Sequence, residues 1–183
     1  MSVDIAVLIG CLASIALVFV WTLITGSPPT PTSAPVRRTI MALLPARLPG
    51  AESQPVYELG AGWGGLSVAL AARYPDRPVV GIEVSPLPWL VAKLRGAVAG
   101  HANLSVRYGD FRKADLSDAA LVVCYLSADL LAELGPKLAG EMPPGALVVS
   151  STFAIPDWQP MDRVTAKDIY KSPVYLYERE ASV

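Results

Sequence analysis

The chain opens with an uninterrupted apolar run. Residues 5–24 read IAVLIGCLASIALVFVWTLI and contain no charged residue. A helix of about 20 apolar residues is long enough to cross the hydrocarbon core of a bilayer. A cleaved signal peptide would have a basic start and a shorter apolar core, whereas this chain starts Met-Ser-Val-Asp. We therefore predict a transmembrane anchor helix within residues 1–25.

A proline-rich stretch follows the apolar run. Residues 26–35 read GSPPTPTSAP, and because proline fixes φ and lacks an amide N–H, we predict a semi-rigid extended linker over residues 26–36. Asp4 precedes the run, and three arginines follow it: Arg37, Arg38 and Arg47. Positive charge collects on the cytoplasmic flank of a membrane helix. This asymmetry predicts a single-pass membrane protein whose C-terminal domain, residues 37–183, is cytoplasmic.

The remainder of the chain repeats a pattern of strand followed by helix. The predicted strands are 56–59, 79–84, 104–108, 121–126 and 146–153, and the predicted helices are 66–73, 86–98 and 130–138. Such a repeat indicates an open α/β sheet of the Rossmann-like, mostly parallel type. Residues 163–170 and 173–179 leave too little room for a crossover helix. We therefore predict that they form a C-terminal antiparallel hairpin.

Composition and charge narrow the possible classes of protein. The chain has 183 residues, 52% of them hydrophobic, and a formal net charge of −1. Without a basic excess, we predict no nucleic-acid partner. The single histidine, His101, and the two cysteines, Cys11 and Cys124, lack the spacing of a metal site. We therefore predict neither a bound metal nor a disulfide framework.

A glycine-rich motif lies between the first predicted strand and the first predicted helix. Residues 57–65 read YELGAGWGG. Glycines at this junction allow a tight turn and let a ligand approach the backbone closely. We predict that Gly60, Gly62 and Gly64 contact a cofactor. Because Gly60, Gly62 and Gly65 also satisfy Gly-x-Gly-x-x-Gly, the turn alone leaves a nicotinamide cofactor open.

Acidic residues stand near the ends of three predicted strands. Glu58 lies just before the first glycine, Glu83 ends the second strand, and Asp110 follows the third. We predict that Glu58 faces the cationic groups of S-adenosylmethionine (SAM), that Glu83 accepts from ribose hydroxyls, and that Asp110 accepts from the adenine amine. Val84 or Phe111 is expected against the adenine ring. A pyrophosphate would be repelled by Glu58, which favours SAM over a dinucleotide.

The reaction class is narrowed by motifs that the chain lacks. It is too short for the separate substrate domain of a dehydrogenase, and it contains no Tyr-x-x-x-Lys. No Asn-Pro-Pro-Tyr follows the fourth predicted strand, which argues against amino methylation of a nucleic acid. Tyr125 stands there instead. We predict that Tyr125 is a catalytic residue lining the mouth where the acceptor enters, with Trp158 as a second wall.

These residues resemble class I SAM-dependent methyltransferases. More narrowly, they are similar to the single-span lysine methyltransferases that modify the ATP synthase c subunit and the adenine nucleotide translocase, together with their prokaryotic relatives. The resemblance covers nearly the whole chain and is carried by four stretches: 57–64, 81–91, 108–111 and 153–160. It implies methyl transfer to a lysine of a protein, membrane proteins included. It also implies that five residues hold SAM: Glu58, Gly60, Gly62, Glu83 and Asp110.

One departure from that family and two alternatives stay open. The family usually has an acidic residue where this chain has Trp63. The first alternative is methylation of a membrane-dissolved small molecule, such as a lipid headgroup or a quinone precursor, which an anchored domain would serve equally well. The second is an inactive scaffold that binds SAM without transferring its methyl group.

Overall fold

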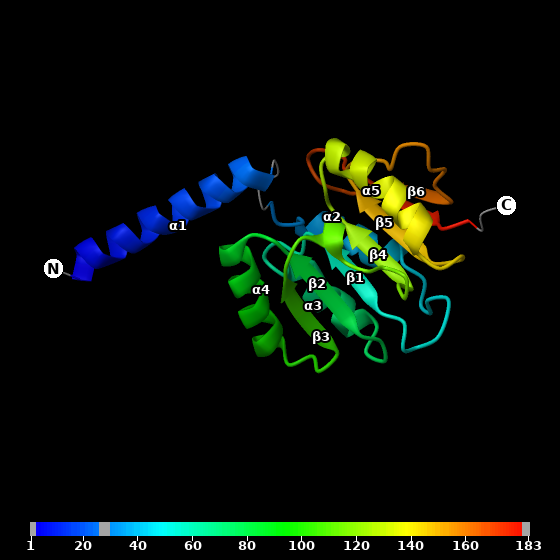
Figure 1. Cartoon of the computed structure of the whole chain (residues 1–183), viewed down its shortest axis with the longest axis horizontal. Coiled ribbons are helices and arrows are strands. Elements are labelled where there is room, and N and C mark those ends of the chain that lie inside the picture. Colours follow the sequence, from blue (N-terminus) through cyan, green and yellow to red (C-terminus); the bar gives the residue numbers. More distant parts are fainter. Residues whose placement is uncertain (1–2, 26–29, 181–183) are drawn as a thin grey trace.

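A seven-stranded sheet forms the centre of the molecule in the computed structural model, which describes residues 3–25 and 30–180 (Figure 1). The strands are β1 (Val56–Leu59), β2 (Val79–Glu83), β3 (Leu104–Tyr108), β4 (Leu121–Cys124), β5 (Leu147–Ser151), β6 (Asp162–Thr165) and β7 (Pro173–Glu178). The helices are α1 (Val3–Thr25), α2 (Ala34–Leu43), α3 (Gly65–Arg73), α4 (Pro86–Ala99) and α5 (Ala128–Glu141), with a short 3₁₀ turn, η1 (Phe111–Lys113).

The strand order confirms the predicted sheet. It runs β3-β2-β1-β4-β5-β7-β6, with β1 to β5 pairing in parallel. β7 pairs antiparallel with both β5 and β6, as expected for the C-terminal hairpin. The parallel strands all end at one edge of the sheet, which is where ligands of open α/β folds bind. The chain reverses its strand order between β1 and β4, so the loop after β1 lies at the switch point of the sheet.

Helices cover both faces of the sheet and enclose two cores. On one face, Val56, Val79, Leu121 and Val123 pack with residues of α2 and α3. On the other face, alternate residues of the same strands pack against α5, including Leu131, Leu134 and Leu138. β1 and β4 are buried along their whole length, since a strand covered on both faces presents no side to water. Side chains of these strands can therefore reach solvent only at the strand ends.

The helix α2 corrects the predicted linker. Residues 26–29 lie outside the described part of the chain, and from Ala34 the backbone is helical. Ser33 caps this helix, its hydroxyl accepting from the Val36 amide at 3.4 Å, and Pro35 occupies the first turn. Proline suits that position because its missing N–H has no partner there. The predicted extended linker up to residue 36 is therefore wrong from Ala34 onward, and α2 belongs to the domain because it buries Val36 and Ile40.

The N-terminal apolar run forms α1, which extends away from the sheet (Figure 1). Its helical conformation confirms part of the sequence prediction. Several of its apolar side chains are exposed, among them Leu8 (58%), Leu12 (57%) and Ile15 (66%). Within the described residues, however, no helix combines the length and the apolar character needed to cross a membrane. The transmembrane part of the prediction is therefore not confirmed.

Candidate cofactor and acceptor site

The turn between β1 and α3 has a backbone that glycine alone adopts readily. Gly60, Gly62 and Gly64 have φ values of 73°, 52° and 77°, in the left-handed region that penalises a side chain. Gly64 also lies against α4, because a Cβ there would come within 2.7 Å of the Ala92 Cβ. At Gly62, by contrast, a Cβ would meet no atom closer than a backbone oxygen at 4.0 Å. The turn therefore packs against α4 at Gly64 and is open at Gly62, where a ligand could approach the backbone.

Glu83 fixes this turn from the end of β2. Its two carboxylate oxygens accept from the Gly62 and Ser85 amides, each at 2.7 Å. The side chain is only 6% exposed. A carboxylate held by two backbone amides keeps further lone pairs in a fixed direction, which suits hydrogen bonds from a ribose diol.

Glu58 is the most perturbed acid of the site. It lies on β1, is only 4% exposed, and accepts a hydrogen bond from the Ser67 hydroxyl of α3. Burial raises the pKa of Glu58 to about 8, against the opposing effect of the Ser67 hydrogen bond. At neutral pH this carboxyl is therefore mostly neutral until a cation approaches. The expectation that Glu58 repels a pyrophosphate assumed an ionised side chain. A neutral carboxyl does not repel an anion in this way, so that argument against a dinucleotide does not hold for the ligand-free protein.

One cleft brings the glycine turn together with residues from four other places in the chain. It has a volume of about 60 Å³ and is lined by Glu58, Gly60, Gly62 and Tyr125, among others. Trp63, Arg37 and Arg95 also line it, as do residues of the segment before α2. The predicted residues Glu58, Gly60, Gly62 and Tyr125 thus meet in one place, and Glu83 joins them through its bond to Gly62.

Tyr125 follows the last residue of β4 and is half-buried. Cys124 pairs with Leu59, the last residue of β1, so Tyr125 stands level with the start of the glycine turn. Its side chain lines the same cleft as Glu58. A group transferred from a cofactor in the glycine turn would therefore pass close to Tyr125.

The adenine-side candidates occupy the next strand ends. Asp110 lines a neighbouring depression with Tyr57, Ile82 and Lys113 instead of the cleft itself. Arg112 is its partner, with Nε at 2.9 Å from Oδ1, and this pair lowers the pKa of Asp110. The Gly109 amide donates to the Glu83 carbonyl at 3.0 Å, so this turn adjoins the ribose site. The role of Asp110 in adenine binding stays a prediction.

Val84 and Phe111 differ in how far an adenine ring could reach them. Val84 is half-buried directly after Glu83. Phe111 is only 8% exposed and packs in the core beneath α5. Contact of either side chain with the ring stays a prediction, and Val84 has the more exposed surface for it.

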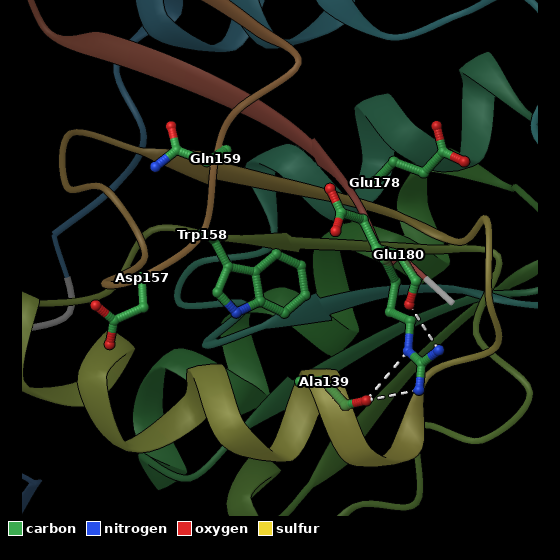
Figure 2. Close-up of a pocket in the computed structure, with 7 residues that line it drawn as sticks. Ala139, Asp157, Trp158, Gln159, Glu178 and Glu180 are labelled. Atoms are coloured by element: carbon green, nitrogen blue, oxygen red, sulfur yellow. Dashed lines mark hydrogen bonds between the residues drawn. The ribbon is translucent and has the colours of Figure 1, made fainter. Parts of the chain in front are cut away.

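Trp158, suggested as a second wall of the acceptor mouth, lines a different pocket. Figure 2 shows it beside Asp157 and Gln159, facing α5, with Glu178 and Glu180 nearby. Its ring meets that of Tyr177 edge-on, with centroids 5.9 Å apart. Arg179 closes the pocket by donating to the Ala139 carbonyl of α5 (Figure 2). We find Trp158 in packing there and not in the cleft of Tyr125.

The structure adds three residues that sequence reasoning had not placed in the site: Ser67, Arg37 and Arg95. Ser67 is recognisable only as the residue two positions after the glycine turn, with no motif of its own. Arg37 and Arg95 come from helices that precede and follow the turn by many residues. Only the packing of α2 and α4 around α3 brings them to the cleft.

A parallel sheet with a glycine turn after β1 and an acid at the end of β2 defines the class of nucleoside-cofactor domains to which SAM-dependent methyltransferases belong. Known proteins then specify the family. The model of the ANTKMT methyltransferase domain matches residues 58–162, and the chain belongs to this family. The matched residues include Glu58, Glu83, Asp110 and Tyr125.

Relatives in sequence and structure agree with this family. A protein-lysine N-methyltransferase of Saccharolobus islandicus is 32% identical over 126 residues, covering 67% of this chain and 77% of that protein. The mouse adenine nucleotide translocase lysine N-methyltransferase is 38% identical over 125 residues, covering 63% of this chain and 53% of that protein. The chain thus spans about half of the mouse relative. A Salinibacter ruber RNA methyltransferase, solved with S-adenosyl-L-homocysteine, has a TM-score of 0.72 and 30% identity over 84% of this chain and 96% of that one.

SAM is therefore the cofactor of this methyltransferase domain, and the groups that line the cleft suit its chemistry. The open front of Gly62 admits a ligand against the backbone, and the fixed Glu83 carboxylate suits a ribose. The buried Glu58 carboxyl gains from a neighbouring positive charge, and SAM has an ammonium and a sulfonium. The polar groups of the cleft therefore match the chemistry of the cofactor.

The pKa of Glu58 predicts a pH effect on the ligand-free protein. A carboxyl whose pKa is raised from 4.5 to about 8 binds its proton more tightly in the folded state. Its contribution to stability is fully present below the unfolded pKa and is lost as pH rises through 8. Between pH 6 and pH 9 the free energy of unfolding should fall by about 3 kcal/mol more in the wild type than in Glu58→Gln. Urea unfolding at both pH values measures this difference.

The matched control for that experiment is Glu52→Gln, which removes an exposed carboxyl. It should keep the wild-type pH dependence. If the free energy of unfolding fell equally in the wild type and in Glu58→Gln, Glu58 would have an ordinary pKa, and its burial would not favour the protonated form.

Proposed function

We propose that this domain transfers a methyl group from SAM to the side-chain amine of a lysine in a protein. The observation that carries the proposal is the cleft in which the glycine turn and Tyr125 lie together, in a chain of this family. Two relatives at 32% and 38% identity are named as lysine methyltransferases. The net charge of −1 favours a protein acceptor over RNA, although the Salinibacter relative is named an RNA methyltransferase.

The residues of the cleft account for positioning. SAM supplies a methyl group on a positively charged sulfur that is already a good leaving group. Glu83 and the glycine turn fix the nucleoside, and Glu58 becomes ionised beside the cationic end. The amine has to approach in line from the opposite side of the methyl carbon, so alignment and exclusion of water are the main contributions of the protein. The parallel strand ends provide a rigid base for that alignment.

An acceptor lysine must lose its proton before it can attack, since its reference pKa is about 10.4. Tyr125 is placed to line the path of the amine, and we assign its phenol oxygen as a hydrogen-bond acceptor that orients the amine toward the methyl group. The partly dry cleft disfavours the ammonium form. Proton loss to solvent then precedes transfer.

We also propose that α1 attaches the domain to a membrane, with the domain on the cytoplasmic side. The support is an apolar helix with exposed side chains, whose one charged residue is Asp4 in its first turn and which is followed by Arg37 and Arg38. SAM is a cytoplasmic metabolite, so this topology gives the cleft access to its cofactor. Such attachment would concentrate the enzyme near membrane-embedded acceptors. The domain limits that we propose are residues 1–25 for the anchor and 34–183 for the catalytic domain, which then includes the whole of α2.

Labelled SAM identifies the acceptor class. The full chain is incubated with membranes and with methyl-labelled SAM, and we expect label on protein, recovered as methyl-lysine after hydrolysis. Glu83→Gln, which weakens the ribose site, should lower transfer by about 10-fold or more. The matched control is Glu52→Gln, a substitution of an exposed acid. Label extracted into organic solvent would instead assign a lipid or quinone-type acceptor, and no transfer despite SAM binding would leave an inactive scaffold.

Tyr125→Phe tests the catalytic assignment. The variant keeps the ring and removes only the oxygen, so we expect kcat to fall by about 10- to 100-fold while the KM for SAM changes little. Tyr170→Phe is the control, because Tyr170 is 81% exposed and lines neither the cleft nor the depression beside Asp110. Steady-state kinetics on a lysine peptide measure both constants. An unchanged kcat for Tyr125→Phe would remove the phenol from the mechanism.

Vesicle flotation tests the role of α1. The full chain should float with phosphatidylcholine–phosphatidylglycerol vesicles. A variant with Leu8→Gln, Leu12→Gln and Ile15→Gln should float much less, because three polar side chains then interrupt the exposed apolar surface of α1. Ile169→Gln replaces an equally apolar residue that is 88% exposed on the domain, and it should float like the wild type. Flotation of the triple variant at the wild-type level would show that α1 does not attach the protein to membranes.

A further inference from the structure

Two arginines from different helices meet beside the glycine turn. Arg37 lies in α2 and Arg95 in α4, and both line the cleft with Glu58 and Tyr125. A Cβ placed on Gly65 would lie 3.3 Å from an Nη1 atom of Arg37 and 3.1 Å from an Nη1 atom of Arg95. The two guanidinium groups therefore converge over the first residue of α3. Gly65 leaves them that space because it has no side chain.

Such a convergence concentrates positive charge at one point. Two like charges a few ångströms apart repel each other, and the amino end of the nine-residue helix α3 adds a partial positive charge. None of the ion pairs among the described residues involves either arginine. An anion between the two groups would offset this repulsion. A planar carboxylate matches the fork of a guanidinium better than it matches a lysine.

The same cleft has the complementary group at another point. Glu58 supplies a carboxyl, so the cleft offers guanidinium groups and an acid within one small volume. An α-amino acid carries a carboxylate and an ammonium group on one carbon. The methionine end of SAM is such an amino acid, and both of its charges would find partners of opposite sign here.

We propose that Arg37 and Arg95 together bind the carboxylate at the methionine end of SAM. This inference rests on the assignment of SAM as the cofactor. The arginines act as positioning residues, because they hold the amino-acid end of the ligand and touch none of the transferred atoms. Pinning that end beside α3, with the ribose at Glu83, orients the sulfur between them along the carboxyl edge toward Tyr125.

The pair also links the cofactor to the packing of three helices. Arg37 comes from α2, Arg95 from α4, and their meeting point is the start of α3. A bound carboxylate would therefore join α2 to the other two helices through one ion-paired cluster. Since α2 is the first element of the domain after α1, ligand binding would fasten that end of the domain against the cleft.

A ligand pair that differs only in the carboxylate tests the proposal. Calorimetry on the full chain compares SAM with decarboxylated SAM, which keeps the sulfonium, ribose, adenine and amino group. The wild type should bind SAM more tightly by about 10- to 100-fold. In the Arg37→Gln, Arg95→Gln double variant, SAM affinity should fall by about the same factor, while affinity for decarboxylated SAM should change less than about threefold. The preference for the carboxylate would disappear.

Controls distinguish a selective loss of SAM affinity from misfolding of the variant and from a wrong cofactor assignment. Arg38→Gln removes the exposed neighbour of Arg37 and should bind both ligands as the wild type does. The Arg37→Lys, Arg95→Lys double variant keeps both charges but lacks the planar guanidinium groups. It should recover part of the preference for SAM over decarboxylated SAM. Equal losses for both ligands, or no loss for SAM, would overturn the arginine assignment while leaving SAM as cofactor. Failure of the wild type to bind SAM would instead refute the cofactor.

Discussion

The left-handed glycine turn after β1 is the constraint on which the site depends. Three glycines with positive φ let the chain reverse from a buried strand into α3 within a few residues. The turn is held by hydrogen bonds to β2, because the Gly60 and Ala61 amides donate to the Ile82 carbonyl and the Gly62 amide donates to the Glu83 carboxylate. Within the turn, the Gly64 amide donates to the Ala61 carbonyl. The end of β2 therefore holds the loop after β1 in place. Ribose recognition and cofactor placement become one structural feature, because the carboxylate that would bind the ribose also orients the turn.

The parallel part of the fold could be read from the sequence because its signals are local. β3 has the predicted limits, and α3 and α4 differ from their predictions by one residue. Each was marked by an apolar run and a turn residue such as Gly100, which caps α4 with φ of 71°. The same logic failed at residues 34–36, where proline indicated a linker although it begins α2. Proline fits both an extended segment and a first helical turn, and only tertiary burial of Val36 and Ile40 selects the helix.

The same distinction between local signals and tertiary packing separates the site residues that could be predicted from those that could not. Glu58, Glu83 and Tyr125 were recognisable because strand ends of a parallel sheet meet at one edge, so position in the sequence fixes position in space. The arginines were not recognisable, since their convergence depends on how α2 and α4 pack against α3. Trp158 shows the converse error. A motif placed it near the acceptor, but its indole packs beside α5 against Tyr177. The protonation of Glu58 was also out of reach, because burial is a property of the fold and not of the motif.

The charges of the cleft explain why an amino-acid-bearing nucleoside fits it better than a dinucleotide does. The arginines alone would suit a pyrophosphate as well as a carboxylate. Glu58 distinguishes the two, because a second anion near it would keep this buried acid protonated, and no ion pair could form with it. A ligand with an ammonium group allows Glu58 to ionise, and the cleft then contains two opposite pairs instead of one excess of positive charge. Selectivity in this site therefore comes from requiring both signs of charge within one ligand, and a pyrophosphate provides only one.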